Sequence, residues 1–366
     1  MFTEKDMDEL VKFKSSNPVI SLYINTEPSE GNAETYKLRM RSMLKDVDLP
    51  SDVSLIERYF DHEYDWTGRG VALFSCSPGK LFRFYPLFIP VSDRINVDDK
   101  PLIMPLASLL DNYGGVGIVL VDKQNMKLFT FHLGYLEEID SIEGVDVKRT
   151  KRGGASTFPG RRGGQADITG YSGEITEKNL KDYSEKATRF FEDSHIRRIV
   201  IGGTEKNATM FFNKLPRQIQ SLVLVTTPIS MNTNTVELQK KIMKICNASG
   251  RKREDQIVDS LLASAARGDE ACLGLHDTLC AINDAKVKSI AISKYFQEIG
   301  YRCRECDFLS VDSNERCRVC QKPLEQDKNI VEHAVSKAIC MGGSVNVVVE
   351  NQLLASNGKI GAILRY

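Results

Sequence analysis

The spacing of hydrophobic and polar residues divides the chain into three blocks, at about residues 1–112, 113–232 and 233–366. In the first block, alternating hydrophobic positions predict strands, and positions that recur every three to four residues predict helices. The expected elements are a helix over residues 8–14, a strand over residues 19–24, a charged helix over residues 33–46 and strands over residues 71–75 and 81–85. Nothing in this block is typical of a catalytic site.

The second block alternates strands with helices, which is typical of a mixed α/β domain. Its expected elements are strands over residues 116–121 and 126–132, a helix over residues 174–193, a strand over residues 198–201, a helix over residues 208–215 and a strand over residues 222–226. Residues 147–173 are expected to be irregular. An irregular segment of more than about 15 residues is unusual in a compact domain and is generally functional or disordered.

The third block predicts a compact α/β/α layer with a small insertion at about residues 300–324. Its expected elements are helical segments over residues 234–284, a strand over residues 290–292, a helix over residues 330–340 and strands over residues 345–349 and 360–365. The fold class expected for the whole chain is therefore α/β, with three domains that coincide with the three blocks.

Composition and charge narrow the class of protein. Hydrophobic residues make up 42% of the chain and charged residues 27%, a balance typical of soluble globular proteins. No apolar run approaches the roughly 20 residues that cross a bilayer, and the first residues lack a signal-peptide pattern, so we expect a cytoplasmic protein without a membrane partner. The 49 basic and 49 acidic residues exclude a histone-like protein but leave a local basic site open.

Four of the nine cysteines form the pattern CxxC-x10-CxxC: Cys303, Cys306, Cys317 and Cys320. Each pair can place two thiolates on a tight turn, and the spacer allows the two turns to close around one ion, so the pattern predicts a zinc site rather than disulfides. Four thiolates leave no open coordination position, so the zinc is expected to be structural. The scattered cysteines are expected to be small core residues: Cys76, Cys246, Cys272, Cys280 and Cys340.

Four arginines surround the cysteine pattern, namely Arg302, Arg304, Arg316 and Arg318. Two interpretations stay open for them. They could contact RNA or a protein partner, or they could screen the charge of the thiolates.

The irregular segment of the second block is strongly basic and rich in glycine. Between residues 148 and 162 there is no acidic residue, and the cations are Lys148, Arg149, Lys151, Arg152, Arg161 and Arg162. Glycines let a backbone approach a ligand closely, and cationic side chains neutralise phosphates. We therefore expect an arm that enters a nucleic-acid cavity; a solvated disordered loop is the alternative.

This arm ends in Gly163-Gly164-Gln165, and here the sequence resembles the class-1 peptide chain release factor family of eukaryotes and archaea, with its bacterial and archaeal relatives. Further segments carry the likeness in the same order along the chain. They are residues 19–24, 117–122, 161–165, 276–279, 285–287 and 360–366. The likeness is specific in the second and third blocks and weak in the first.

The resemblance implies a three-domain architecture and a ribosome-dependent activity. The middle domain would be ribonuclease-H-like, and the last would resemble kink-turn-binding ribosomal proteins with a metal-binding minidomain inserted. The glycines would carry the loop into the peptidyl-transferase centre of the large ribosomal subunit. There the backbone N–H of Gln165 would stabilise the leaving ribose oxygen of peptidyl-tRNA, and its side chain would place water. The last domain would be the place for a translational GTPase partner.

The rest of the chain offers no self-contained catalytic set. His132 and His195 stand beside apolar stretches and are interpreted as structural, and no phosphate-binding loop of the P-loop type is present. The function expected from the resemblance is therefore hydrolysis of the peptidyl-tRNA ester on the ribosome.

Two departures from the family pattern bear on whether the reaction would serve termination at stop codons or rescue of stalled ribosomes. Residues 166–171 follow the glutamine in place of the family's basic, aromatic helix start, and Asp167 adds a negative charge. The first block also lacks an Asn-Ile-Lys-Ser stop-codon element. Ribosome rescue or quality control is therefore favoured over stop-codon-dependent termination. The alternatives are a non-catalytic surveillance adaptor of the pelota type and a tRNA-end nuclease.

Overall fold

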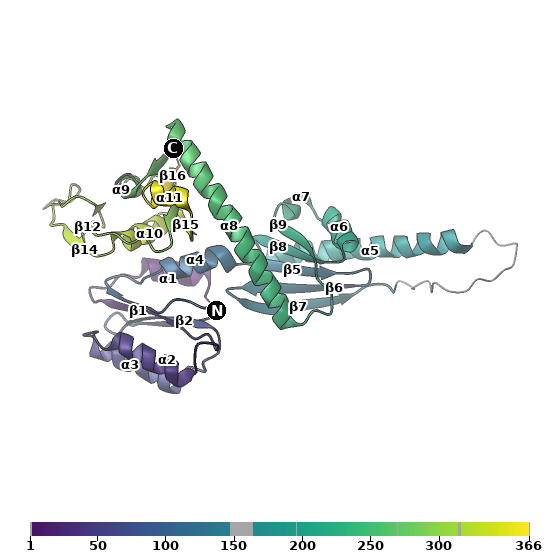
Figure 1. Ribbon diagram of the computed structural model, residues 1–366, viewed down its shortest axis with the longest axis horizontal. Helices are drawn as coiled ribbons and strands as arrows, with labels where there is room; N and C mark the ends of the chain where they lie inside the picture. Colours follow the sequence, from purple (N-terminus) through teal and green to yellow (C-terminus); the bar gives the residue numbers. More distant parts are fainter. Residues whose placement is uncertain (1, 147–163, 195, 269, 314–315, 366) are drawn as a thin grey trace. The chain divides into compact units, whose positions relative to one another are not determined.

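The computed structural model describes residues 2–146, 164–194, 196–268, 270–313 and 316–365, with the backbone alone at residues 164–172. The chain folds into two compact units (Figure 1). Unit 1 combines Met1–Asn112 with Asn247–Tyr366, and unit 2 is Tyr113–Cys246. The mixed α/β class is confirmed, whereas the division into three domains stays a prediction. None of the helices in the described part of the chain combines the length and apolar character that crossing a bilayer requires.

Unit 2 contains a five-stranded sheet with the strand order β7-β6-β5-β8-β9. Strands β5 to β7 form an antiparallel meander, and β5, β8 and β9 are parallel. The elements in chain order are β5 (Val116–Val121), β6 (Asn125–His132), β7 (Tyr135–Glu143), α5 (Gly164–Asp193), β8 (Arg198–Gly203), α6 (Glu205–Lys214), α7 (Arg217–Gln220), β9 (Val223–Pro228) and the first part of α8 (Thr235–Arg267).

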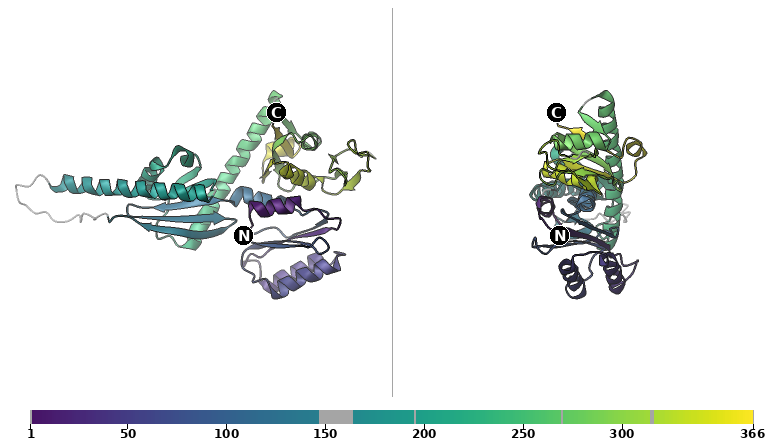
Figure 2. Two further views of the ribbon diagram at one scale, coloured as in Figure 1. Left: turned by 180° about the vertical axis from the view of Figure 1, so that it is seen from behind. Right: turned by 90° about the vertical axis from the view of Figure 1, so that its left-hand side faces the viewer.

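Strand β5 is buried on both faces because all its side chains are apolar or absent. Val119 and Val121 belong to the core cluster that α5 and α6 complete, and Ile118 and Leu120 belong to the cluster completed by α8. Figure 2 shows α5 lying along the sheet from a second side. Gly117 permits this contact, since a Cβ there would lie 2.6 Å from the ring of Phe191 on α5.

The first segment of unit 1 is an antiparallel sheet with the order β3-β2-β1-β4. Helices α2 and α3 pack on one face of this sheet, and α1 lies on the other (Figure 1). The elements are α1 (Glu4–Lys12), β1 (Val19–Asn25), α2 (Ala33–Leu44), α3 (Pro50–His62), β2 (Gly70–Cys76), β3 (Leu81–Leu87), β4 (Arg94–Asp98) and α4 (Met104–Tyr113).

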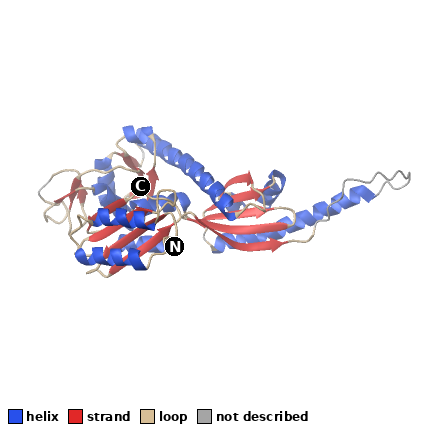
Figure 3. Cartoon of the chain, turned by 60° about the horizontal axis from the view of Figure 1, so that its bottom comes forward, coloured by secondary structure: helices blue, strands red, loops and turns tan. Residues whose placement is uncertain are grey.

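The second segment of unit 1 has a sheet with the order β10-β16-β11-β15 and a small sheet with the order β13-β12-β14. Figure 3 shows the strands of these sheets with helices packed against them. The elements are the end of α8, β10 (Ala271–Leu273), α9 (Leu275–Asn283), β11 (Val287–Ser293), β12 (Gly300–Arg302), β13 (Leu309–Ser310), β14 (Glu325–Asp327), α10 (Ile330–Cys340), β15 (Ser344–Val348), α11 (Gln352–Ser356) and β16 (Ile360–Leu364).

The predicted start of the helix at residue 174 was wrong. Helix α5 begins at Gly164, so the last ten residues of the segment expected to be irregular, 164–173, are helical. Gly170 and Gly173 lie within this part of the helix. Each glycine costs a helix only about 1 kcal/mol relative to alanine, and no proline interrupts residues 164–193, so a helix anchored further along can continue through them.

A network of charges joins the two segments of unit 1. Arg302 of β12 is buried, and its guanidinium lies 2.7 Å from Asp99 and 2.8 Å from Asp307. Lys100 also contacts Asp307, at 3.1 Å. Nearby, Glu332 Oε1 on α10 accepts the backbone N–H groups of Ile103 at 2.7 Å and Met104 at 3.0 Å. The chain before α4 is thus held by side chains that are more than 200 residues away in sequence.

His333 extends this network. Its Nε2 lies 2.9 Å from Asp327 and 3.3 Å from Asp98, and the guanidinium of Arg302 is also close, at 3.4 Å. Burial lowers the pKa of His333, but the hydrogen bonds to the two carboxylates outweigh burial and raise it from 6.5 to about 9. A histidine in this setting stabilises the folded state in its charged form.

We expect unit 1 to become less stable as the pH rises from 6.5 through about 9. The stabilisation by His333 is fully present below its unfolded pKa of 6.5 and is lost through the folded value, a change on the order of 3 kcal/mol in the free energy of unfolding. The measurement is urea unfolding of the wild type and His333→Gln at pH 6.0 and 9.5. The difference between the two proteins should shrink at the higher pH.

The exposed His62 supplies the matched control, because His62→Gln changes a histidine outside the network. A destabilisation by His333→Gln that is the same at both pH values would contradict the expectation.

Candidate functional site

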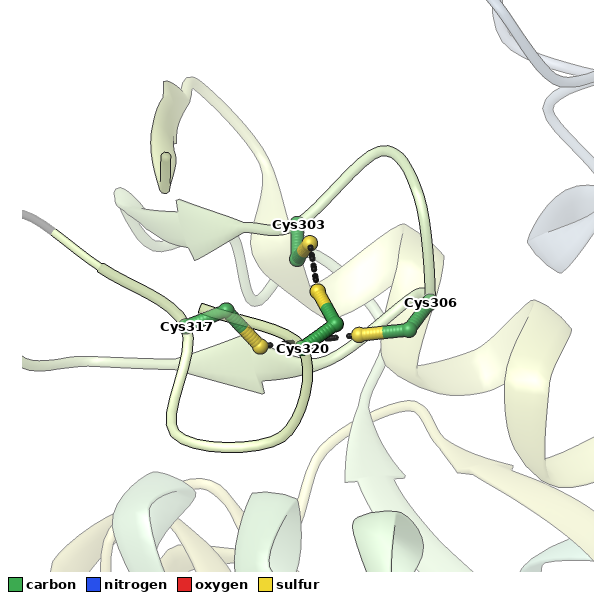
Figure 4. Close-up of side chains that lie close together, drawn as sticks. All are labelled: Cys303, Cys306, Cys317 and Cys320. Carbon is green, nitrogen blue, oxygen red and sulfur yellow. Dashed lines mark hydrogen bonds between the residues drawn. The ribbon is translucent and has the colours of Figure 1, made fainter. Parts of the chain in front are cut away.

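The four cysteines of the CxxC-x10-CxxC pattern lie together (Figure 4). Their four Sγ atoms are all within 4.8 Å of one another, with Cys303 and Cys320 at 3.4 Å and Cys306 and Cys317 at 3.5 Å. Bonds of about 2.3 Å from a tetrahedral metal would set the sulfurs roughly 3.8 Å apart, whereas a disulfide needs about 2.05 Å. The cluster therefore has the dimensions of a metal site.

The two halves of the cluster share one backbone geometry. The N–H of Cys303 donates to the carbonyl of Phe308 at 2.9 Å, and the N–H of Cys317 donates to the carbonyl of Lys322 at 2.8 Å. The residue after each pair has a positive φ, 55° at Asp307 and 60° at Gln321. Each half is thus a tight turn that points two thiols to the same side, as a metal knuckle requires.

Local donors favour a thiolate at Cys317. Burial raises the pKa of Cys317, but backbone N–H groups of Cys320 and Val319 outweigh burial and lower it to about 7. The N–H of Val319 lies 3.4 Å from the sulfur. Such N–H donors stabilise a charged sulfur without supplying a competing cation.

The arginines around the cluster contact carboxylates. Arg302 belongs to the buried network, Arg304 lies 2.7 Å from Glu325, and Arg318 lies 3.6 Å from Asp312. Arg302 is therefore neither an RNA contact nor a screen for the thiolates. Of the scattered cysteines, Cys76 and Cys246 are buried as expected, but Cys280 and Cys340 are exposed, so the core prediction was wrong for those two.

A second group of metal-type ligands is formed by Asp98, Asp327 and His333. These side chains are within ligand distance of one another, yet the guanidinium of Arg302 is 3.4 Å from the same Nε2 that would face a metal. Like charges at this distance repel, so the group is better described as an ion-pair network than as a cation site.

Of the residues expected to carry the chemistry, the structure describes the backbone of Gly164 and Gln165. Lys148, Arg149, Lys151, Arg152, Arg161, Arg162 and Gly163 lie outside the described residues, as does His195. Gly164 and Gln165 are the first two residues of α5. The first four N–H groups of an α-helix have no partner within the helix, and the dipole makes this end positive.

A buried asparagine fixes the chain where it leaves the sheet toward residue 147. Asn179 of α5 accepts the N–H of Val145 at 3.0 Å and donates to the carbonyl oxygens of Val145 at 2.9 Å and Lys123 at 3.0 Å. Tyr183, one turn later, donates to the carbonyl of Gln124 at 2.6 Å. A Cβ at Gly144 would collide with both side chains, so the end of β7 lies directly against α5.

Sequence reasoning missed Asn179, although a signal was present. It lies in the same helical stripe as Leu180, Tyr183 and Ala187, which are core residues. A polar side chain at a core-facing position needs a partner, because an unpaired buried amide is costly. Here the partner is the main chain at the base of the basic segment.

Among the side chains of α5 that the structure describes, the buried ones lie between Thr176 and Phe191. An α-helix rises 1.5 Å per residue, so Gly164 lies about 18 Å along the axis from Thr176. Figure 1 shows this part of α5 continuing past the end of the sheet. The helix is thus anchored at one end and carries Gln165 at the other.

His132 lies on β6 and is held by the main chain. Its Nδ1 accepts the N–H of Gly115 at 3.3 Å. This contact is consistent with the structural role expected for it.

Residues 101–245 match the bacterial archaeo-eukaryotic release factor family 10. This stretch of the chain is similar to a release factor family. The match covers the basic segment, the Gly163-Gly164-Gln165 tripeptide and almost all of unit 2.

Several solved structures are similar to this chain. The archaeal translation termination factor aRF1 is 15% identical, with 99% of this chain and 97% of that chain covered and a TM-score of 0.27. Dom34 of S. cerevisiae, a translation termination-like factor that interacts with Hbs1, is 11% identical, with 78% and 73% covered and a TM-score of 0.43. Pelota of Archaeoglobus fulgidus is 13% identical, with 100% and 92% covered and a TM-score of 0.34. No curated protein matches the chain.

We expect the cysteine cluster to bind one metal ion per chain and to support the network of unit 1. Asp307 follows directly after Cys306 and contacts both Arg302 and Lys100, so opening the knuckle should release those contacts. Chelation, or Cys306→Ser, should lower the melting temperature and speed amide exchange over residues 98–104. Metal content by mass spectrometry and hydrogen exchange are the measurements.

Cys280→Ser is the matched control, since Cys280 is exposed and outside the cluster. Equal metal content and equal exchange in Cys306→Ser and Cys280→Ser would contradict the assignment.

We also expect Asn179→Ala to free the end of β7. The change removes three hydrogen bonds and leaves the N–H and carbonyl of Val145 without them, which should cost about 1–3 kcal/mol. Amide exchange at residues 144–146 should rise, as measured by mass spectrometry. The control is Asn213→Ala, an exposed asparagine in the same unit. Equal amide exchange at Val145 in Asn179→Ala and Asn213→Ala would contradict the role assigned to Asn179.

Proposed function

We propose that this chain hydrolyses the ester bond of peptidyl-tRNA on the large ribosomal subunit, using Gly163, Gly164 and Gln165. The observation that carries the proposal is the tripeptide, whose last two residues begin α5, within a region that matches a release factor family. Rescue of stalled ribosomes, or quality control, is the proposed occasion, because residues 1–112 contain no Asn-Ile-Lys-Ser element.

The start of α5 offers the chemistry that ester hydrolysis needs. As the leaving ribose oxygen gains negative charge, a preorganised N–H donor lowers the energy of the transition state. The N–H of Gln165 lies in the first turn of α5, where it has no helical partner and where the helix dipole is positive. The side chain of Gln165 would place the attacking water, and ribosomal RNA would supply the remaining groups.

The anchored helix supports delivery of Gln165 to a deep site. The contacts of Asn179 and Tyr183 hold the base of the basic segment, while the start of α5 is about 18 Å further along the helix. A reactive group placed at the end of a rigid element can enter a narrow RNA-lined cavity without moving the domain that carries it. The proposed RNA contacts on the way are Lys148, Arg149, Lys151, Arg152, Arg161 and Arg162.

We further propose that the ion held by Cys303, Cys306, Cys317 and Cys320 is a structural zinc. The four sulfur ligands and the turn geometry suit zinc, and no ligand position is left for substrate. Its role would be to hold Asp307 in the network of unit 1. A translational GTPase, if the chain uses one, would bind the segment 247–366.

We expect Gln165→Ala to reduce peptide release from purified ribosome–nascent-chain complexes by about 100-fold, since loss of a positioning group has that order of effect. Gln165→Pro should reduce release by a further 10- to 100-fold, because proline removes the N–H donor yet is tolerated in the first turn of a helix. Ribosome binding should be unchanged in both variants.

The control is Gln218→Ala, an exposed glutamine on α7 of the same unit. Full peptide-release activity in Gln165→Pro would contradict the proposal. Ribosome binding with no release by the wild type would instead indicate an adaptor of the pelota type, and a tRNA without its intact 3′ end would indicate a nuclease. Comparing stop-codon-programmed ribosomes with split large subunits then separates termination from rescue.

A further inference from the structure

A cavity outside the site above lies in unit 1. Its volume is about 510 Å³, and both segments of the unit line it. Residues of β1, the turn into β4 and the start of α4 form one wall, and the turn after β11 forms the other. A cavity of roughly 300–1,000 Å³ is the usual size for a small-molecule site.

The apolar part of the wall is deep, and the polar part is near the mouth. Tyr23, Met104 and Val347 line the cavity and are buried. Tyr295 stands beside them with 72% of its side chain exposed, which is unusual for an aromatic residue without a partner surface. An exposed ring at the edge of an apolar cavity is suited to stacking on a planar ligand.

Two cations line the same cavity. Lys294 has its ammonium 5.3 Å from the ring of Tyr295, and no carboxylate in the described part of the chain is within ion-pair distance of it. Arg94 interacts electrostatically with the buried Glu332. Burial raises the pKa of Glu332, and the positive charge of Arg94 acts in the opposite direction and lowers it. Lys294 is thus the cation that has no compensating charge.

The acidic residue of the cavity is already neutralised. Asp93 lies 2.9 Å from the guanidinium of Arg39 and accepts the N–H of Asn25 at 2.6 Å. The uncompensated charge that lines the cavity is therefore the positive charge of Lys294. The polar lining of the cavity also includes Ser108 and Gln297, which are available as further donors.

From this arrangement we propose that the cavity binds a phosphorylated small molecule with a planar ring, the chemistry of a nucleotide. Tyr295 would stack on the ring at the mouth, and Lys294 and Arg94 would hold the phosphates. Charge-assisted hydrogen bonds to phosphate supply affinity, and the neighbouring ring supplies preference for a planar group. The site lies in unit 1 and needs no ribosome, so it is independent of the proposed hydrolysis.

The test is fluorescence titration of the full chain with mant-ATP and mant-GTP in the absence of ribosomes. We expect saturable binding that unlabelled nucleotide displaces. Lys294→Glu should weaken it by about 10- to 100-fold, the effect of losing one charge-assisted hydrogen bond. Ser108→Trp, which fills the cavity from α4, should abolish it. The matched control is Lys288→Glu, an exposed lysine on β11 outside the cavity, which should bind as the wild type does.

Three results would overturn the proposal. The first is no binding of either probe at millimolar concentration by protein with a normal unfolding transition. The second is binding that Lys294→Glu and Ser108→Trp leave unchanged. The third is binding of a short RNA oligonucleotide alone, with neither nucleotide displacing it.

Discussion

The buried guanidinium of Arg302 is the constraint on which unit 1 depends. An arginine that is 6% exposed must be paired, because an uncompensated buried charge costs several kcal/mol. One partner, Asp307, is five residues away on the cysteine turn, and the other, Asp99, comes from the first segment of the unit. Satisfying this single charge therefore requires the first segment and the cysteine turn to assemble together. The backbone contacts of Glu332 with Ile103 and Met104 then follow in the same interface.

In unit 2 the main contacts hold the second half of helix α5 against the sheet. Phe191 packs over Gly117, and Asn179 satisfies the main chain at the base of the basic segment. Everything described as buried in α5 lies from Thr176 onward. The unit thus combines an ordinary two-faced sheet with a helix whose described buried side chains begin twelve residues after its start. The match to a release factor family falls on this unit, which is where the tripeptide lies.

Local patterns in the sequence were sufficient for much of the fold. The apolar run of β5 and the helical period of α10 were predicted within a residue or two of their ends. The cysteine cluster was predicted from spacing alone, because CxxC turns are local structures. The early start of α5 was missed, since glycine content misleads where a distant anchor stabilises a helix. The pairing of Arg302 with Asp99 was not predictable, because nothing local relates residues so far apart in the chain.

The position of Asp307 after Cys306 has a thermodynamic consequence. Only a chain with both cysteine turns closed could hold a metal ion, so a bound ion would act as a ligand of the native state. Above saturation, each tenfold rise in free metal would add about 1.4 kcal/mol to the free energy of unfolding. The same increment would oppose separation of the two segments of unit 1, because Asp307 belongs both to the cysteine turn and to the charge network that joins the segments. Metal supply would thereby set how long this chain survives proteolysis.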